Sequence, residues 1–167
     1  MNILDPINIV PTKREQKKPR FTFKEKGKQY TAINPQLKVC HEYHHLDKQE
    51  FFDNRPCVDD ALYLIKDKIL YLIELKGSDI KRAYQQVSST FDDLNANNCL
   101  DNCTTKARIV LKKTRTPALR SSELKVLVKK CKHKGLEVII GDHEKFIRHK
   151  NSSHRTRICR ATISSTF

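Results

Sequence analysis

Residues 58–77 read VDDALYLIKDKILYLIELKG, two apolar runs separated by a short charged stretch. Each run is rich in leucine, isoleucine and tyrosine and has the length of a strand, so residues 58–65 and 69–75 predict two β-strands. The intervening residues 66–68, Lys-Asp-Lys, have the polarity of a turn. The stretch therefore predicts an antiparallel hairpin inside a folded domain.

The residues around the hairpin predict further helices and strands. Apolar side chains recur at helical spacing from residue 80 to residue 94, and Ser78 or Asp79 is placed to cap that helix. The order of elements predicts an α/β protein with a mixed sheet and helices packed on its faces. We expect the remaining elements to be a helix at 36–52 ended by Pro56, a loop at 94–105, a strand at 107–111, a helix from 124 to Gly135 and a strand at 136–140.

Two charged residues interrupt the second apolar run. Glu74 and Lys76 are two positions apart, so their side chains leave the same face of the strand. If residues 66–68 form a three-residue loop, Asp60 lies opposite Glu74 with the two Cβ atoms about 5 Å apart. A hard divalent cation between the two carboxylates would compensate their repulsion. A loop one residue longer or shorter would bring Asp59 to this position instead.

Each of these signals has an ordinary structural explanation when taken alone. Glu-x-Lys on an exposed strand is usually a solvated ion pair, and adjacent acids such as Asp59 and Asp60 often occupy turns. Gln86 on the following helix could equally be a surface amide. Their joint occurrence in apolar strands, ahead of an amphipathic helix, favours a functional site.

Asp60, the run Glu74-Leu75-Lys76-Gly77 and the helical pair Ala83-x-x-Gln86 resemble the core of the PD-(D/E)xK nuclease superfamily. This restriction-endonuclease-like family includes Holliday junction resolvases and RecB-type nuclease domains. The resemblance implies a mixed sheet flanked by helices, with an αβββαβ core followed by a further helix and strand.

The resemblance also implies roles for individual residues. Asp60 (with Asp59 as the alternate) and Glu74 would bind Mg²⁺ or Mn²⁺, Lys76 would assist the attacking water, and Gln86 would support the site. Many family members place another acid on the first helix. Glu42 and Glu50 are both candidates here, and nothing in the sequence chooses between them.

The sequence departs from the family pattern in three ways. The literal Pro-Asp dipeptide is absent, because Asp60 comes four residues after Pro56. No convincing strand stands between the first predicted helix and Val58, although residues 28–33 or 51–55 could supply one. Cys159 stands alone near the C-terminus, where members with an iron–sulfur cluster carry several cysteines.

Composition favours a polyanionic partner. The 167 residues include 33 Lys and Arg against 19 Asp and Glu, a formal net charge of +14. No apolar run approaches the roughly 20 residues that cross a bilayer, and the N-terminus does not resemble a signal peptide, so we expect a cytoplasmic protein, nucleoid-associated when bound. The six cysteines are then reduced thiols. A zinc site at Cys99, Cys103, Cys131 and His133 would lack well-spaced ligand pairs.

The basic excess is concentrated near the two ends. Residues 13–28 hold eight Lys and Arg against two acids, and residues 148–160 hold five against none. We therefore expect a basic arm at 1–33, a nuclease-like domain at 34–147 and a basic tail at 148–167. The candidate phosphate-binding residues are Lys17, Lys18, Lys81, Arg82, Arg155 and Arg157.

The resemblance implies a Mg²⁺-dependent endonuclease or exodeoxyribonuclease, similar to a resolvase or restriction enzyme, and the basic charge favours double-stranded or branched DNA as its substrate. Tyr and Phe total 12 and Trp is absent, so a base-stacking platform is not evident. Cutting both strands would suit a homodimer. The alternative is a non-catalytic nucleic-acid-binding subunit of a defence or repair complex on the same fold. A third hypothesis is a basic ribosome-associated protein with surface ion pairs in the hairpin.

Overall fold

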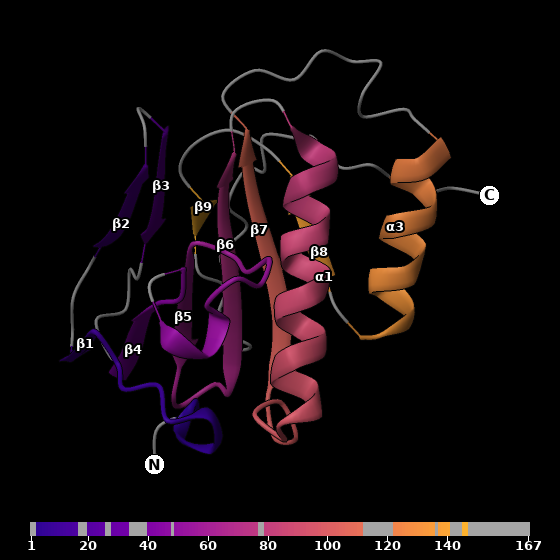
Figure 1. Cartoon of the computed structure of the whole chain (residues 1–167). Coiled ribbons are helices and arrows are strands. Elements are labelled where there is room, and N and C mark those ends of the chain that lie inside the picture. The colour runs from indigo at the N-terminus through magenta and orange to yellow at the C-terminus, as the bar shows by residue number, and fades with distance from the viewer. Residues whose placement is uncertain are drawn as a thin grey trace.

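A computed structural model describes residues 3–16, 20–25, 28–33, 40–47, 49–76, 79–111, 122–135, 137–140 and 145–146. These residues form two sheets, two longer helices and two short 3₁₀ turns (Figure 1). In chain order the elements are η1 (Asp5–Ile7), β1 (Lys13–Gln16), β2 (Arg20–Glu25), β3 (Lys28–Ile33), β4 (Cys40–His45), η2 (Glu50–Phe52), β5 (Asp60–Leu64), β6 (Ile69–Lys76), α1 (Ile80–Ala96), β7 (Thr104–Leu111), α3 (Ser122–His133), β8 (Glu137–Ile140) and β9 (Lys145–Phe146).

The main sheet is mixed, as the sequence predicts. Its six strands have the order β1-β4-β5-β6-β7-β8. The pairs β1–β4, β4–β5 and β5–β6 are antiparallel, whereas β6–β7 and β7–β8 are parallel. Helix α1 connects β6 to β7, and α3 precedes β8, because parallel neighbours require a crossover connection.

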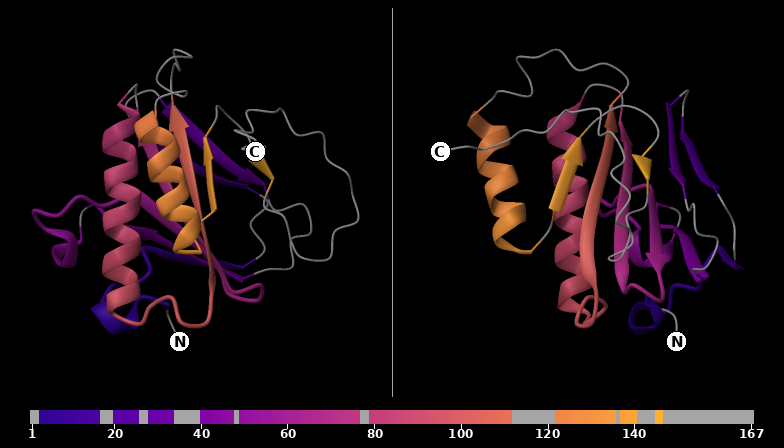
Figure 2. Two further views of the ribbon diagram at one scale, coloured as in Figure 1. Left: turned by 90° about the vertical axis from the view of Figure 1, so that its right-hand side faces the viewer. Right: turned by 180° about the vertical axis from the view of Figure 1, so that it is seen from behind.

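Both helices lie on one face of the main sheet, and a second sheet covers the other face (Figures 1 and 2). The second sheet has the order β2-β3-β9. The prediction of helices on both faces is therefore wrong for the described residues. The physical reason is that β6 is apolar on both faces: Leu70 and Leu72 pack in the core that includes α1, whereas Tyr71 and Ile73 belong to a second core with Phe21 of β2.

The predicted helix at 36–52 is wrong where the structure describes it. Residues 40–45 form β4, and only residues 50–52 make a single 3₁₀ turn, while residues 34–39 lie outside the described part of the chain. Side chains in β4 alternate with period two: Glu42 and His44 are fully buried, whereas Tyr43 and His45 are half-buried. Strand β4 therefore supplies the strand ahead of Val58 that the family pattern requires and that the sequence patterns did not predict.

The β5–β6 hairpin has a register one residue away from the predicted one. Asp60 lies opposite Ile73, and Leu64 lies opposite Ile69, so the loop contains four residues and not three. The fourth loop residue is Lys68, whose backbone adopts a left-handed conformation (φ 51°). Its carbonyl oxygen accepts a hydrogen bond from the Thr104 N–H (2.8 Å), so a contact with the start of β7 holds this loop.

The helix boundaries agree with their sequence signals. Asp79 caps α1, since its carboxylate accepts a hydrogen bond from the Arg82 N–H (3.0 Å). Helix α3 is followed by Gly135 in a left-handed conformation (φ 76°), as predicted for a C-terminal glycine. Within the described residues, no helix combines the length and the apolar character that crossing a bilayer requires.

Residues 13–16, 20–25 and 28–33 are built into the fold where a basic arm was expected. They supply β1 at one edge of the main sheet and both long strands of the second sheet. The residues before them also contribute to the core, because Leu4, Ile7 and Ile9 are buried. Basic residues hide this role in the sequence, since they alternate with the buried Phe21 and Phe23. The expected basic tail at 148–167 lies outside the described residues.

Candidate active site

The observed hairpin register brings Asp59 next to Glu74. The Asp59 N–H donates to Glu74 Oε2 (3.2 Å), and the Leu75 N–H donates to Asp59 Oδ2 (2.7 Å). Both carboxylates are buried, with exposed fractions of 7% for Asp59 and 0% for Glu74. Two buried acidic side chains therefore meet near the carboxyl end of β6.

Lys76 lies beside this pair on the same face of β6. Its Nζ is 2.6 Å from Glu74 Oε1, which makes no regular hydrogen bond within the described residues. The Lys76 side chain is 18% exposed, so the ammonium lies between the buried carboxylates and solvent. The predicted shared face of Glu74 and Lys76 is thus observed.

The charges at this site are not balanced. Burial and the negative charge of Asp59 raise the pKa of Glu74 from 4.5 to about 7, although Lys76 and the Asp59 N–H oppose the shift. One ammonium partly compensates two buried carboxylates, so ionised Glu74 is held at a cost. An added cation would offset that cost.

Helix α1 anchors the segment that carries Asp59. Gln86 donates from Nε2 to the Cys57 carbonyl oxygen (2.5 Å). Thr90 Oγ1 accepts from the Val58 N–H (2.9 Å) and donates to the Gln86 carbonyl oxygen (2.8 Å). Gln86 therefore supports the site through the backbone before Asp59, and its own Oε1 is buried without a hydrogen-bond partner among the described residues.

Thr90 is a supporting residue that the sequence reading missed. Its signal is a hydroxyl within the apolar stripe of α1, four residues after Gln86 and therefore on the same side of the helix. A threonine at such a position commonly bonds back to its own helix, so the sequence alone does not reveal the second bond to Val58.

Asp60 points away from Glu74, so the predicted pair of Asp60 and Glu74 is wrong and Asp59, the alternate, takes the place. Because Asp60 is opposite Ile73, its side chain leaves the other face of the sheet. Asp60 Oδ1 accepts a hydrogen bond from the Tyr43 hydroxyl (2.8 Å) and lies 2.5 Å from His45 Nδ1. Burial and the nearby Asp60 raise the pKa of Tyr43 well above its usual value.

Neither candidate for an additional acid joins the pair. Glu42 pairs with Tyr63 of β5, which in turn pairs with Leu70 of β6. Leu70 comes four residues before Glu74, so Glu42 and Glu74 are about 13 Å apart along the strand direction. Glu42 is fully buried and accepts a hydrogen bond from the Ile3 N–H (3.3 Å). Glu50 is exposed on the short turn η2.

The buried residue beside Glu42 is His44, which is also fully buried. Burial lowers the pKa of His44 to about 4, despite the negative charge of Glu42. Neither ring nitrogen of His44 has a hydrogen-bond partner in the described part of the chain. His44 is therefore neutral, and the Glu42–His44 pair belongs to the core beneath the N-terminal segment.

Of the six candidate phosphate-binding residues, two can be placed. Lys81 and Arg82 are exposed on the first turn of α1, a few residues beyond Lys76. They lie at the edge of the sheet where β6 ends, which is the edge of the site. The other four, Lys17, Lys18, Arg155 and Arg157, lie outside the described residues.

The donor set at the site suits a hard cation. No group of three or more His, Cys, Asp or Glu ligands occurs among the described residues. Mg²⁺ typically takes only one or two carboxylates and completes its shell with water and phosphate oxygens. Asp59 and Glu74 are compatible with that pattern, since Glu74 Oε1 lies beside the Lys76 ammonium and makes no hydrogen bond within the described residues.

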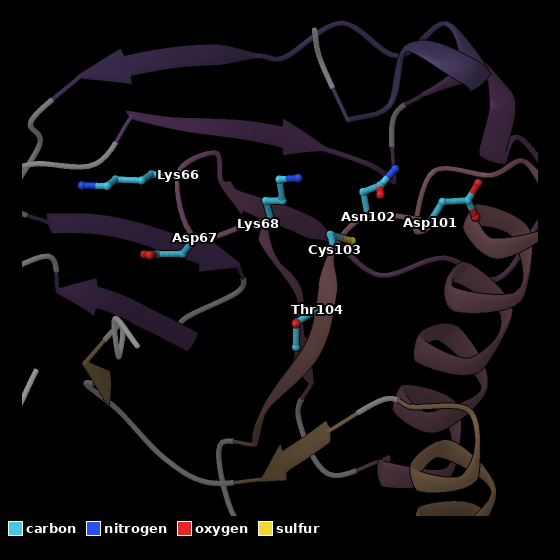
Figure 3. Close-up of a pocket in the computed structure, with 7 residues that line it drawn as sticks. All are labelled: Lys66, Asp67, Lys68, Asp101, Asn102, Cys103 and Thr104. Atoms are coloured by element: carbon cyan, nitrogen blue, oxygen red, sulfur yellow. The ribbon is translucent and has the colours of Figure 1, made fainter. Parts of the chain in front are cut away.

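A solvent-open pocket of about 560 Å³ lies elsewhere, at the far end of the hairpin (Figure 3). Lys66, Asp67 and Lys68 of the β5–β6 loop line one side, and residues 101–104 before β7 line the other. The two lysines there are accompanied by two aspartates, so the pocket has no strong preference for one sign of charge. The buried carboxylate pair lies at the opposite end of β6.

No protein-family model matches this chain, and no match was found among curated proteins or among solved structures.

Proposed function

We propose that this protein is a metal-dependent nuclease that hydrolyses phosphodiester bonds in DNA. The observation that carries the proposal is the meeting of Asp59, Glu74 and Lys76 at one end of β6. A fold keeps two buried carboxylates side by side only at a cost in stability, and a cation-binding role accounts for that cost.

The order of elements supports the same proposal. Strands β4, β5 and β6 form an antiparallel meander, and α1 then leads to β7, which is parallel to β6. The resemblance implied this arrangement for the restriction-endonuclease-like core, with a further helix and strand at the positions of α3 and β8. Among the described residues, the 3₁₀ turn η1 is the one helical element that precedes β4, so the first helix of that core adds nothing to this support.

Asp59 and Glu74 would hold Mg²⁺ or Mn²⁺ through their carboxylate oxygens. The bound ion would polarise the scissile phosphate and lower the pKa of an attacking water. The Lys76 ammonium, next to Glu74 and partly exposed, is placed to orient that water or to stabilise the charge that develops on the phosphate. Gln86 and Thr90 keep Asp59 in position through the backbone of residues 57–58.

The charge of the chain supports DNA as the substrate. The net charge of +14 attracts a polyanion, and Lys81 and Arg82 lie at the same edge as the carboxylates. Double-stranded or branched DNA, endonucleolytic or exonucleolytic cutting, a homodimer, and a cytoplasmic, nucleoid-associated location all remain parts of this proposal.

A plasmid-cleavage assay tests the proposal. Supercoiled plasmid should be nicked or cut with Mg²⁺ or Mn²⁺ and left intact with EDTA. Asp59→Asn, Glu74→Gln and Lys76→Met should each lower the cleavage rate at least about 100-fold while DNA binding persists. Asp101→Asn, a change of an exposed acid at the far end of the sheet, is the matched control and should cut like the wild type.

Asp60→Asn separates the two register hypotheses. Because Asp60 faces Tyr43 and His45, this variant should keep its metal-dependent cleavage within a few-fold of wild type. Wild-type activity in the Asp59→Asn and Glu74→Gln variants would refute the assignment of the site. Metal-independent DNA binding with no cutting would leave the non-catalytic subunit as the function.

A further inference from the structure

The outward face of α3 is strongly basic. Residues 122–134 contain five lysines and one glutamate. The five lysines and His133 are all exposed, and α3 lies at the outer edge of the helical layer, beside α1 (Figure 1). These exposed residues are Lys125, Lys129, Lys130, Lys132, His133 and Lys134.

Ordinary helix stabilisation explains only part of this charge. Lys130, Lys132 and His133 lie in the last turn, where a positive charge interacts favourably with the helix dipole. Lys134 forms an ion pair with Asp92 of α1. Lys125, Lys129 and Lys132 are spaced i, i+4 and i+7, so they form one line along the helix. Like charges at this spacing repel one another, and the line concentrates positive charge on one exposed side of α3.

We propose that the line Lys125, Lys129 and Lys132 binds the phosphate backbone of duplex DNA. The inference rests on the proposed nuclease function and adds a docking surface to it. The line extends about 10 Å along the helix axis, enough to contact several phosphates.

The line begins at the same end of the main sheet as the candidate site. Helices α1 and α3 each lead into a strand that is parallel to its predecessor, so both helices start at the sheet edge where β6 and β7 end. Lys125 is therefore at the end of α3 that lies toward the sheet edge carrying Lys76, Lys81 and Arg82, and the later lysines extend away from that edge. DNA that lies along α3 would be led toward the carboxylate pair.

Charge without an apolar partner surface favours nucleic acid over a membrane. Among the α3 residues whose side chains are described, Val126 (66% exposed) is the one large apolar side chain that is strongly exposed, and the lysines around it are exposed too. An amphipathic membrane helix needs a continuous apolar face outside, whereas Cys131 of α3 is buried against the protein core. A polyanion that contacts the lysine ends fits this surface better.

The test measures the salt dependence of DNA binding. Fluorescence anisotropy with a labelled 30-base-pair duplex, in EDTA so that nothing is cut, would be recorded from 50 to 200 mM NaCl. The triple variant Lys125→Gln, Lys129→Gln, Lys132→Gln should reduce the slope of log K against log salt by about 0.9 for each lost phosphate contact, or by about 2 to 3 in total.

A matched control removes the same charge elsewhere. Lys24→Gln, Lys66→Gln and Lys68→Asn change three exposed lysines away from α3 and should alter the slope by less than about 0.5. A triple Lys→Arg variant of the α3 line should retain the wild-type slope, which separates lost charge from a misfolded helix.

Three results would overturn the inference: equal slope changes in the two triple variants, no duplex binding by the wild type, or binding to anionic phosphatidylserine vesicles but not to DNA. The nuclease proposal is judged separately, by plasmid cleavage. Loss of slope in the α3 variant together with uncut plasmid would refute the nuclease while the DNA-docking surface stands.

Discussion

Replacing Glu74 by Gln should stabilise the protein at neutral and alkaline pH while abolishing DNA cleavage. Glu74 is fully buried, and its pKa is raised to about 7 by burial and by the charge of Asp59. Gln has nearly the same shape as protonated Glu but cannot ionise. The variant therefore avoids the cost of a buried, poorly compensated charge.

The size and sign of the effect follow from proton linkage. Below pH 4.5 Glu74 is protonated in both the folded and the unfolded chain, so it does not change the free energy of unfolding. Between 4.5 and about 7 the folded chain keeps a proton that the unfolded chain has lost, so the free energy of unfolding falls as the pH rises. At about 1.4 kcal/mol per pH unit, the loss reaches about 3 kcal/mol above pH 7.

Urea denaturation of both proteins at pH 4.5 and pH 8, in EDTA, measures this effect. The stability gap between Glu74→Gln and wild type should widen by about 3 kcal/mol at the higher pH, or roughly 6 to 12 °C in Tm. The control Asp101→Asn changes an exposed acid outside the site and should match the stability of the wild type at pH 8. Added Mg²⁺ at pH 8 should stabilise the wild type and leave Glu74→Gln unchanged.

A gap that stays constant from pH 4.5 to pH 8 would refute this reasoning. It would mean that Lys76 and the Asp59 N–H fully compensate ionised Glu74. The site would then have no electrostatic reason to take up a cation, and the proposed metal-binding role would lose its main support.

Three further changes test the supporting structure. In the wild type, the free energy of unfolding should fall by up to about 3 kcal/mol between pH 6.5 and pH 4, because His44 takes up a proton in the unfolded chain but not in the folded chain, where its pKa is about 4. His44→Leu should remove this loss. Acid titration followed by circular dichroism measures it, and an unchanged loss in the variant would contradict the reasoning. Thr90→Val should cost about 1–3 kcal/mol by leaving the buried Val58 N–H without its acceptor and should slow cleavage; wild-type stability in urea would argue against the anchor. Asp79→Ala should lower stability by about 1 kcal/mol through loss of the α1 cap, measured by thermal melting, with Asp79→Asn as the conservative control expected to melt like wild type.

Local patterns predicted the centre of the fold. The two apolar runs of the hairpin, the helical spacing from residue 80 and the glycine after α3 each correspond to an observed element. These elements are predictable because their signals lie within one segment: periodicity, a capping carboxylate and a left-handed glycine act over a few residues.

Strand β4 shows where local signals fail. Its residues Cys40–His45 include three histidines and a glutamate, a composition with weak preference for either helix or strand. Pairing with β5 on one side and β1 on the other decides its conformation. The second sheet was hidden for a related reason, since its many basic residues obscure the buried Phe21 and Phe23.

The sequence by itself determined that Glu74 and Lys76 share one face of a buried strand, because the alternation of a strand leaves no other arrangement. It also limited the opposing acid to one of two adjacent residues. The tertiary structure decided between them: Lys68 turns left-handed and bonds to Thr104, which lengthens the loop by one residue and brings Asp59 to Glu74. Because strand side chains have a period of two, that single residue sends Asp60 to the opposite face.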